Sequence, residues 1–253
     1  MCNYANAAGL LMDISMKIWI DIIRPLKRFQ IFEEGVSNFA EITQDKEEAD
    51  WAICWNHTDF PSLRTIVAEN PYLSDSAGRP YYALSVGGHN GSGRTSALDR
   101  WDHMELKPEP WRDTGDWILV CTQRGIGTGE MRMSAYWPMV IHKRLFELTE
   151  KHIEIRKPPS RDFTQKPLQE VFERAFAVVI WTSNVGTLAL YSGIPVYLCG
   201  PHHIMEDAME RDLSNIDTPS YLNRDKAFRR LSGAQFTHEE IRSGFALELL
   251  IGG

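Results

Sequence analysis

Three strand-like runs in the second half of the chain each end in basic or small polar residues. The three endings read CTQRG, IRKPP and WTSNVG. In an open parallel sheet, ligands bind beyond the carboxyl ends of the strands, so these endings would meet at one edge. Cations converging there with polar donors would suit a pyrophosphate. The predicted anion-binding residues are Gln123, Arg124, Gly125, Arg156, Lys157, Ser183, Asn184, Gly186 and Thr187.

The third ending, in WTSNVGTLALYSGIPVYLCG, admits two interpretations. In the first, Ser183 or Asn184 caps a helix, Gly186 lets a ligand approach its first turn, and the free N–H groups attract an anion. In the second, the same residues form an ordinary capped helix between two buried strands, closed by a C-terminal glycine. Arg124 and Arg156 at neighbouring strand ends favour the anion site.

The elements that would position these residues alternate between strand and helix from residue 115 onward. This alternation is typical of parallel βαβ units. We predict strands at 115–124, 153–159, 176–183 and 194–200, and helices at 134–152, 166–175, 184–193, 224–233 and 237–250. The last helix opens with Thr237 and Glu240 in capping-box spacing.

The first half of the chain is less regular. It contains two predicted strands, at 47–56 and 79–88. A stretch rich in Gly, Pro and charged residues follows, between Gly87 and Asp116, and its length indicates a functional loop or an interdomain connector. We therefore expect two domains, 1–112 and 113–253.

The bulk composition narrows the class of protein. The chain has 253 residues, 43% of them hydrophobic, enough for a substantial core. Its net charge of -7 gives no general attraction to nucleic acid or to an anionic membrane, so either role would need a local basic patch. Four widely spaced cysteines suit buried thiols in a reducing compartment. No apolar run approaches the ~18 residues of a membrane span, and we predict a soluble, cytoplasmic protein without one.

The order of these motifs resembles the C-terminal nucleotide-sugar domain of GT-B glycosyltransferases, in particular the capsular-polysaccharide and phage-encoded members. The resemblance covers about the second half of the chain. It rests on Gln123, Arg124, Gly125, Arg156, Pro159, Ser183, Asn184, Gly186, Ala189, Leu190, Gly193, Ile194, Pro195 and Val196.

The resemblance implies an α/β fold of two Rossmann-like lobes, the N-terminal one reduced. The C-terminal lobe would bind the nucleotide-sugar donor, and the acceptor would lie in the cleft. It also implies that no metal or other cofactor is needed, because basic side chains and helix dipoles would neutralise the leaving diphosphate. His202, after the strand 194–200, would meet the sugar. Where similar proteins often have R-P-H-P, this chain has RKPP, so the role of the missing histidine would pass to Lys157.

Sugar transfer needs a base that takes the proton of the acceptor hydroxyl. We predict His89 and Asp59 for this role, with His57 and Asp99 as further candidates. Each of them also suits a turn or a helix cap. The pair His202-His203 shows no third ligand at metal-binding spacing, so we predict no metal site.

The sequence leaves more than one possibility for the acceptor and for the type of reaction. Phage-encoded relatives suggest a hydroxymethylated pyrimidine in DNA, reached through the basic groups 143–144, 156–157 with Arg161, and 224–230. A saccharide or small molecule better suits the acidic chain. A sugar-nucleotide epimerase would use Glu130 and Glu206 as acid and base. A non-catalytic nucleotide-binding module is the third alternative. The donor base, the sugar, the stereochemical outcome and the oligomeric state stay open.

Overall fold

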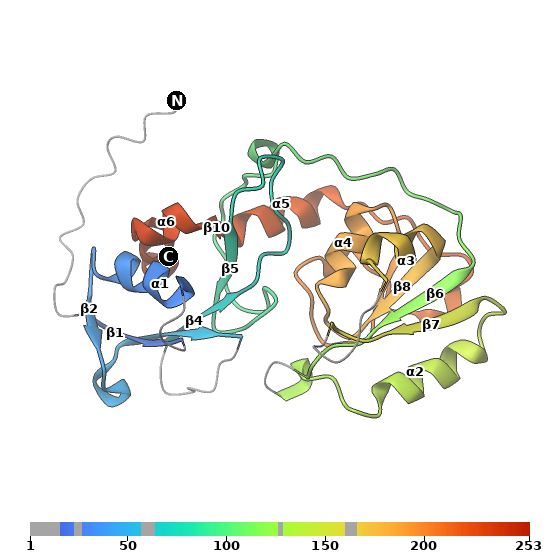
Figure 1. Ribbon diagram of the computed structural model, residues 1–253, viewed down its shortest axis with the longest axis horizontal. Coiled ribbons are helices and arrows are strands. Elements are labelled where there is room, and N and C mark those ends of the chain that lie inside the picture. Colours follow the sequence, from blue (N-terminus) through green and yellow to red (C-terminus); the bar gives the residue numbers. More distant parts are fainter. Residues whose placement is uncertain (1–15, 23–26, 57–63, 126–128, 160–165) are drawn as a thin grey trace.

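The chain folds into two α/β lobes that lie side by side, each built around its own sheet (Figure 1). The computed structural model describes residues 16–22, 27–56, 64–125, 129–159 and 166–253. The two-lobed α/β architecture confirms the expected fold class.

The first lobe contains a mixed sheet of six strands in the order β10-β5-β4-β3-β1-β2. Its strands are β1 (Lys17–Asp21), β2 (Glu41–Thr43), β3 (Trp51–Trp55), β4 (Arg64–Glu69), β5 (Tyr81–Val86) and β10 (Gln235–Thr237). β2, β1, β3 and β4 run parallel, whereas β5 is antiparallel to both of its neighbours. The central strands are buried apolar runs, as expected of parallel strands covered on both faces.

Three helices cover one face of this sheet: α1 (Lys27–Val36), α6 (His238–Arg242) and α7 (Phe245–Gly252). Their buried residues join those of the strands in one apolar cluster. Gly35 is required where α1 meets α6, because a Cβ at this position would collide with the carbonyl oxygen of Ile241.

The second lobe contains a parallel sheet of four strands in the order β7-β6-β8-β9. Its elements are β6 (Trp117–Cys121), α2 (Trp137–Phe146), β7 (His152–Arg156), α3 (Leu168–Arg174), β8 (Ala175–Ile180), α4 (Val185–Tyr191), β9 (Val196–Leu198) and α5 (Asp225–Gly233). Successive residues of β6 face opposite sides of the sheet: Ile118 packs in the cluster with α2, and Leu119 in the cluster with α3 and α4. The sheet is therefore covered on both sides. Short 3-10 turns lie at Lys46–Glu48, Asp102–Met104, Gly129–Met131, Glu206–Ala208 and Leu213–Asn215.

The C-terminal segment returns to the first lobe, although the expected boundary assigned all of 113–253 to the second. β10 pairs with β5, and α6 packs against α1. The predicted capping box of Thr237 and Glu240 is confirmed. The single helix expected over 237–250 is instead two helices, because Gly244 adopts a left-handed φ of 85° between them.

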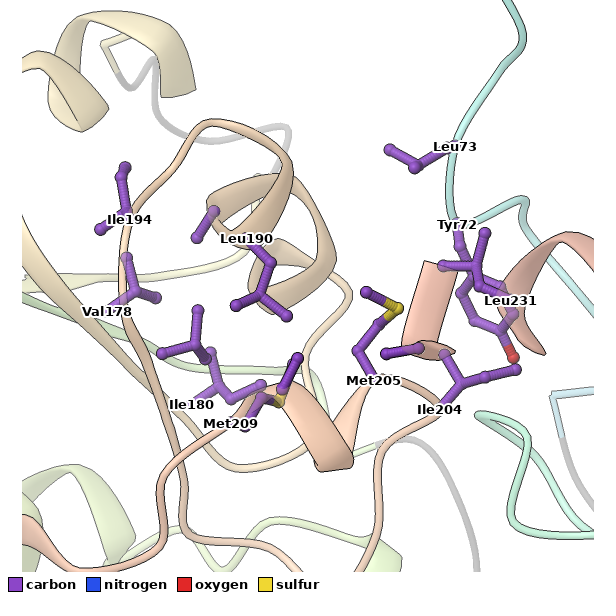
Figure 2. Close-up of a cluster of buried hydrophobic side chains, with 14 of the residues drawn as sticks. Tyr72, Leu73, Val178, Ile180, Leu190, Ile194, Ile204, Met205, Met209 and Leu231 are labelled. Carbon is purple, nitrogen blue, oxygen red and sulfur yellow. The ribbon is translucent and has the colours of Figure 1, made fainter. Parts of the chain in front are cut away.

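The two lobes share an apolar cluster (Figure 2). Tyr72 and Leu73, which follow β4, belong to the same cluster as Ile180 of β8 and Leu231 of α5. This shared core holds the carboxyl ends of the second sheet close to the end of β4.

Candidate functional site

A pocket of about 440 Å³ lies between the lobes, at the carboxyl ends of β4, β6, β7 and β8. The first lobe contributes Asn56, Glu69, Asn70, Tyr72, His89 and Asn90 to its lining. The second lobe contributes the three polar strand endings singled out in the sequence. The pocket is thus located where ligands bind in open parallel sheets.

The basic residues predicted from the strand endings line this pocket together: Arg124 after β6, Arg156 at the end of β7, and Lys157 beside it. The Arg124 guanidinium donates to the carbonyl oxygen of Pro159, and Arg156 Nη1 donates to that of Lys166 at 2.9 Å. Within the part of the chain that the structure describes, neither guanidinium is ion-paired with a carboxylate. Among the described residues, no carboxylate thus competes with an anion for these two charges.

Gln123 connects two strand ends. Its Oε1 accepts hydrogen bonds from the backbone N–H of Thr182 at 3.0 Å and from the Thr182 hydroxyl at 2.9 Å, while its Nε2 donates to the carbonyl of Met131 at 3.1 Å. The amide is engaged on both sides. Gln123 thus fixes the spacing of the β6 and β8 endings, and it also lines the pocket, where its contact with a ligand stays a prediction.

The start of α4 differs from the predicted anion cradle. Ser183 accepts a long hydrogen bond of 3.4 Å from the N–H of Val185. The side chain of Asn184 caps no helix N–H; it crosses to the first lobe and donates to the carbonyl oxygens of Pro71 and Tyr72 at 3.2 and 3.3 Å. α4 has only seven residues. Asn184 therefore holds the lobes together.

Gly186 and Thr187 lie outside the pocket lining and are buried. A Cβ at Gly186 would stand 2.6 Å from Ile180 Cδ1 and 2.9 Å from Met209 Cε. This glycine therefore allows close packing of α4 on the sheet, a role other than the approach of a ligand for which it was predicted. Gly125 also lies outside the lining. Its φ of 68° is in the left-handed region, which accounts for a glycine at this position.

The remaining predicted residues lie elsewhere. His202 is outside the pocket lining, with its Nδ1 3.0 Å from Glu206 Oε1, and Glu206 also pairs with Arg211 at 2.9 Å. Glu130 lies outside the lining as well, so neither carboxylate expected of an epimerase reaches this pocket.

Two predicted bases and the question of a metal remain. Asp59 and His57 fall outside the described residues, while Asp99 is ion-paired with Arg229 at 2.9 Å, outside the pocket. No group of three or more His, Cys, Asp or Glu with metal-binding geometry occurs among the residues described.

His89 does line the pocket, and it faces a carboxylate that the sequence did not single out. His89 Nδ1 lies 3.7 Å from Glu69 Oε1. Burial raises the pKa of Glu69 to about 7. Burial also lowers the pKa of His89, with His202 as a second cause. The pair therefore combines a carboxyl group with a raised pKa of about 7 and an imidazole whose pKa is lowered, a perturbation common at functional sites.

Asn90 holds this pair in position. Its backbone N–H donates to Glu69 Oε2 at 2.5 Å, and its side chain donates to the carbonyl oxygen of Thr182 at 2.7 Å. Asn90 adopts a left-handed φ of 56°, which asparagine tolerates better than most residues. A continuous path of hydrogen bonds thus runs from Glu69 through Asn90 and Thr182 to Gln123, beside the cations.

Comparisons with known proteins support the fold. The chain is similar to the structure of KpsC, beta Kdo 2,7 transferase, from Thermosulfurimonas dismutans, with 14% identity, a TM-score of 0.55, and coverage of 92% of this chain and 99% of that one. Its similarity to KpsC, beta Kdo 2,4 transferase, from the same organism is weaker, with 11% identity, a TM-score of 0.45, and coverage of 87% and 90%. No protein-family model and no curated protein matches the chain. The fold is thus GT-B-like, with two Rossmann-like α/β lobes facing a common cleft.

Proposed function

We propose that this protein transfers a sugar from a nucleotide-sugar donor to an acceptor hydroxyl in the pocket between its lobes. One observation carries the proposal: the Glu69–His89 pair and the guanidinium groups of Arg124 and Arg156 line the same pocket. Sugar transfer needs both, a group that takes a proton and cations that receive the leaving phosphate. The fold shared with a Kdo transferase supports it.

The residues divide the work by lobe. Arg124, Arg156 and Lys157 would stabilise the negative charge that develops on the leaving phosphate, without a metal ion. Glu69 would accept the proton of the acceptor hydroxyl, since a carboxyl with a pKa of about 7 is half ionised at neutral pH. His89, neutral and adjacent, would orient the acceptor.

For the acceptor, the charge distribution favours a saccharide or small molecule over DNA. Two of the basic residues expected to follow a DNA backbone, Arg229 and Arg230, are ion-paired with Asp99 and Asp207. Arg224 stacks on Trp111. A DNA acceptor would give binding that weakens steeply with salt.

The test is a thermal-shift titration with UDP-, GDP-, CMP- and dTDP-sugars. A donor that binds only the folded protein raises its melting temperature, by the equivalent of about 2.7 kcal/mol at a hundred times its Kd. The variant Arg124→Ala/Arg156→Ala should lose this shift, while its melting temperature without donor should equal that of the wild type. Arg242→Ala, which removes an exposed cation paired with Glu34 outside the pocket, should respond like the wild type.

The outcomes separate the alternatives. No shift with any sugar nucleotide in the wild type would defeat the proposal. A shift without sugar transfer to any acceptor would leave a nucleotide-binding module. Epimerised donor in a mixture without acceptor would replace transfer by epimerisation.

A further inference from the structure

The surface of α2 exposes a concentration of large apolar side chains. Tyr136, Met139, Val140 and Phe146 are 73%, 68%, 58% and 75% exposed. They are four of the six large hydrophobic residues that stand exposed in the described part of the chain. Isolated exposed apolar residues are ordinary, but a contiguous group marks an interaction surface.

The helical geometry places this group on the side of α2 that faces away from the sheet. Positions 136, 139, 140, 143 and 146 follow the spacing of one helix face. The opposite face carries Trp137, Ile141 and Leu145, which are buried in the core of the second lobe. The packing of α2 on the sheet therefore does not need the exposed apolar stripe.

The charges of residues 131–146, next to the stripe, are all positive, while Glu130 and Glu147 border this segment at its two ends. Arg132, Lys143 and Arg144 lie in this segment, which contains no Asp or Glu, although the whole chain carries -7. Lys143 stands within the stripe by its spacing, and Arg144 beside it lies 3.6 Å from Glu147 and also interacts electrostatically with Asp212. Apolar side chains flanked by cations on an exposed helix are the pattern of helices that lie in the interface of an anionic bilayer.

We propose that α2 is a docking surface for an anionic lipid bilayer, with the apolar stripe placed among the headgroups and Lys143 and Arg144 against lipid phosphates. A second copy of this chain is the less favourable occupant. Two-fold pairing of α2 with itself would bring these cations near the same cations of the other copy.

Docking at α2 would also bring the pocket near the bilayer. The rings of Trp137 and Trp181 have centroids 5.8 Å apart, and Trp181 precedes Thr182 of the pocket lining. The proposal does not depend on sugar transfer, because no residue of the pocket belongs to α2. No described helix has the length and apolar character to cross a membrane, so the contact would be peripheral.

The experiment is co-sedimentation of the full chain with phosphatidylcholine vesicles and with vesicles that also contain phosphatidylglycerol, at low and high salt. The wild type should bind the anionic vesicles and release them as salt rises. Lys143→Glu/Arg144→Glu should weaken binding at least about tenfold, since each basic residue near such a surface contributes about fivefold. Met139→Ser/Phe146→Ser should weaken it similarly. Phe245→Ser, at an exposed apolar residue of α7, is the matched control and should bind like the wild type.

Two results would overturn the proposal. One is a failure to confirm lipid binding: either the wild type does not sediment with anionic vesicles, or both α2 variants sediment with them as well as the wild type does. The other is a dimer in analytical ultracentrifugation that Met139→Ser/Phe146→Ser converts to monomer, which would assign the stripe to a second copy. Circular dichroism and the donor-induced thermal shift, measured on the same variants, would show that fold and pocket are intact.

Discussion

Glu69 is a pocket residue whose carboxyl group has a pKa well above its ordinary value. Its carboxyl group is buried at the end of β4, and the hydrogen bonds from Asn90 and Tyr72 only partly offset the cost of ionising it there. The result is a pKa of about 7. Such a group links the stability of the fold to pH.

We expect Glu69 to make the protein less stable as pH rises. Its pKa is higher in the folded state, about 7, than its ordinary value of 4.5 in an unfolded chain, so between these values the folded state binds more protons. Stability therefore falls from about pH 4.5 to about pH 7, by on the order of 3 kcal/mol. Glu69→Gln keeps an acceptor for Asn90 and should remove this dependence, so that it is more stable than the wild type at alkaline pH.

Urea unfolding at acidic and alkaline pH measures this effect, with Glu147→Gln, an exposed carboxylate on the second lobe, as the control. A wild-type profile that Glu69→Gln leaves unchanged would show that Glu69 ionises normally. If Glu69 is also the base, the same variant should lose sugar transfer, and wild-type activity should fall as pH drops below about 7.

At the scale of elements, Gly186 shows how α4 is seated on the second sheet. Gly186→Ala would press a methyl group against Ile180 and Met209. We expect it to cost about 1–3 kcal/mol, the usual range for an overpacked core. Chemical denaturation measures this cost. Ser192→Ala, at the C-cap of the same helix, is the control and should change stability little. A Gly186→Ala protein as stable as the wild type would mean that α4 moves away at no cost.

The elements predicted from sequence are those whose signal is local. β6, β8 and β9 are short apolar runs and β7 is a short run that prolines follow, and all four occur near the expected positions. β10 has only three residues, and it is a strand because it pairs with β5. No local sequence pattern therefore predicts it. β1, β2 and β4 were missed as well, and with β4 its last residue, Glu69.

The site residues, too, were predictable only where the sequence carries a local signal. Arg124, Arg156 and Lys157 were expected at one edge because parallel strands bring their endings there, and all three line the same pocket. At Gly186 core side chains occupy the space beside the glycine, and a glycine in a sequence does not reveal whether core or ligand fills that space. The His89–Glu69 contact joins residues from two different strand endings, and only the folded lobe brings them together.

At the scale of the whole molecule, the return of the chain makes the first lobe depend on the C-terminal segment. Phe236 of β10 is fully buried among residues of the first sheet, α1 and α7. Phe236→Ala should therefore destabilise the protein by about 3–5 kcal/mol. Thermal unfolding checks it, with Phe245→Ala as the exposed counterpart that should change little. Equal losses in the two variants would mean that β10 contributes no core.

The pairing of β10 with β5 also sets an order of events during synthesis. β5 leaves the ribosome long before its outer neighbour, because residues 87–234, which include all of the second sheet, are made between them. Throughout that time the edge of β5 exposes unpaired backbone groups, a template for association with other chains. The lobe that is made first is thus the one completed last, and the nascent chain is most vulnerable to aggregation while its second lobe is being built.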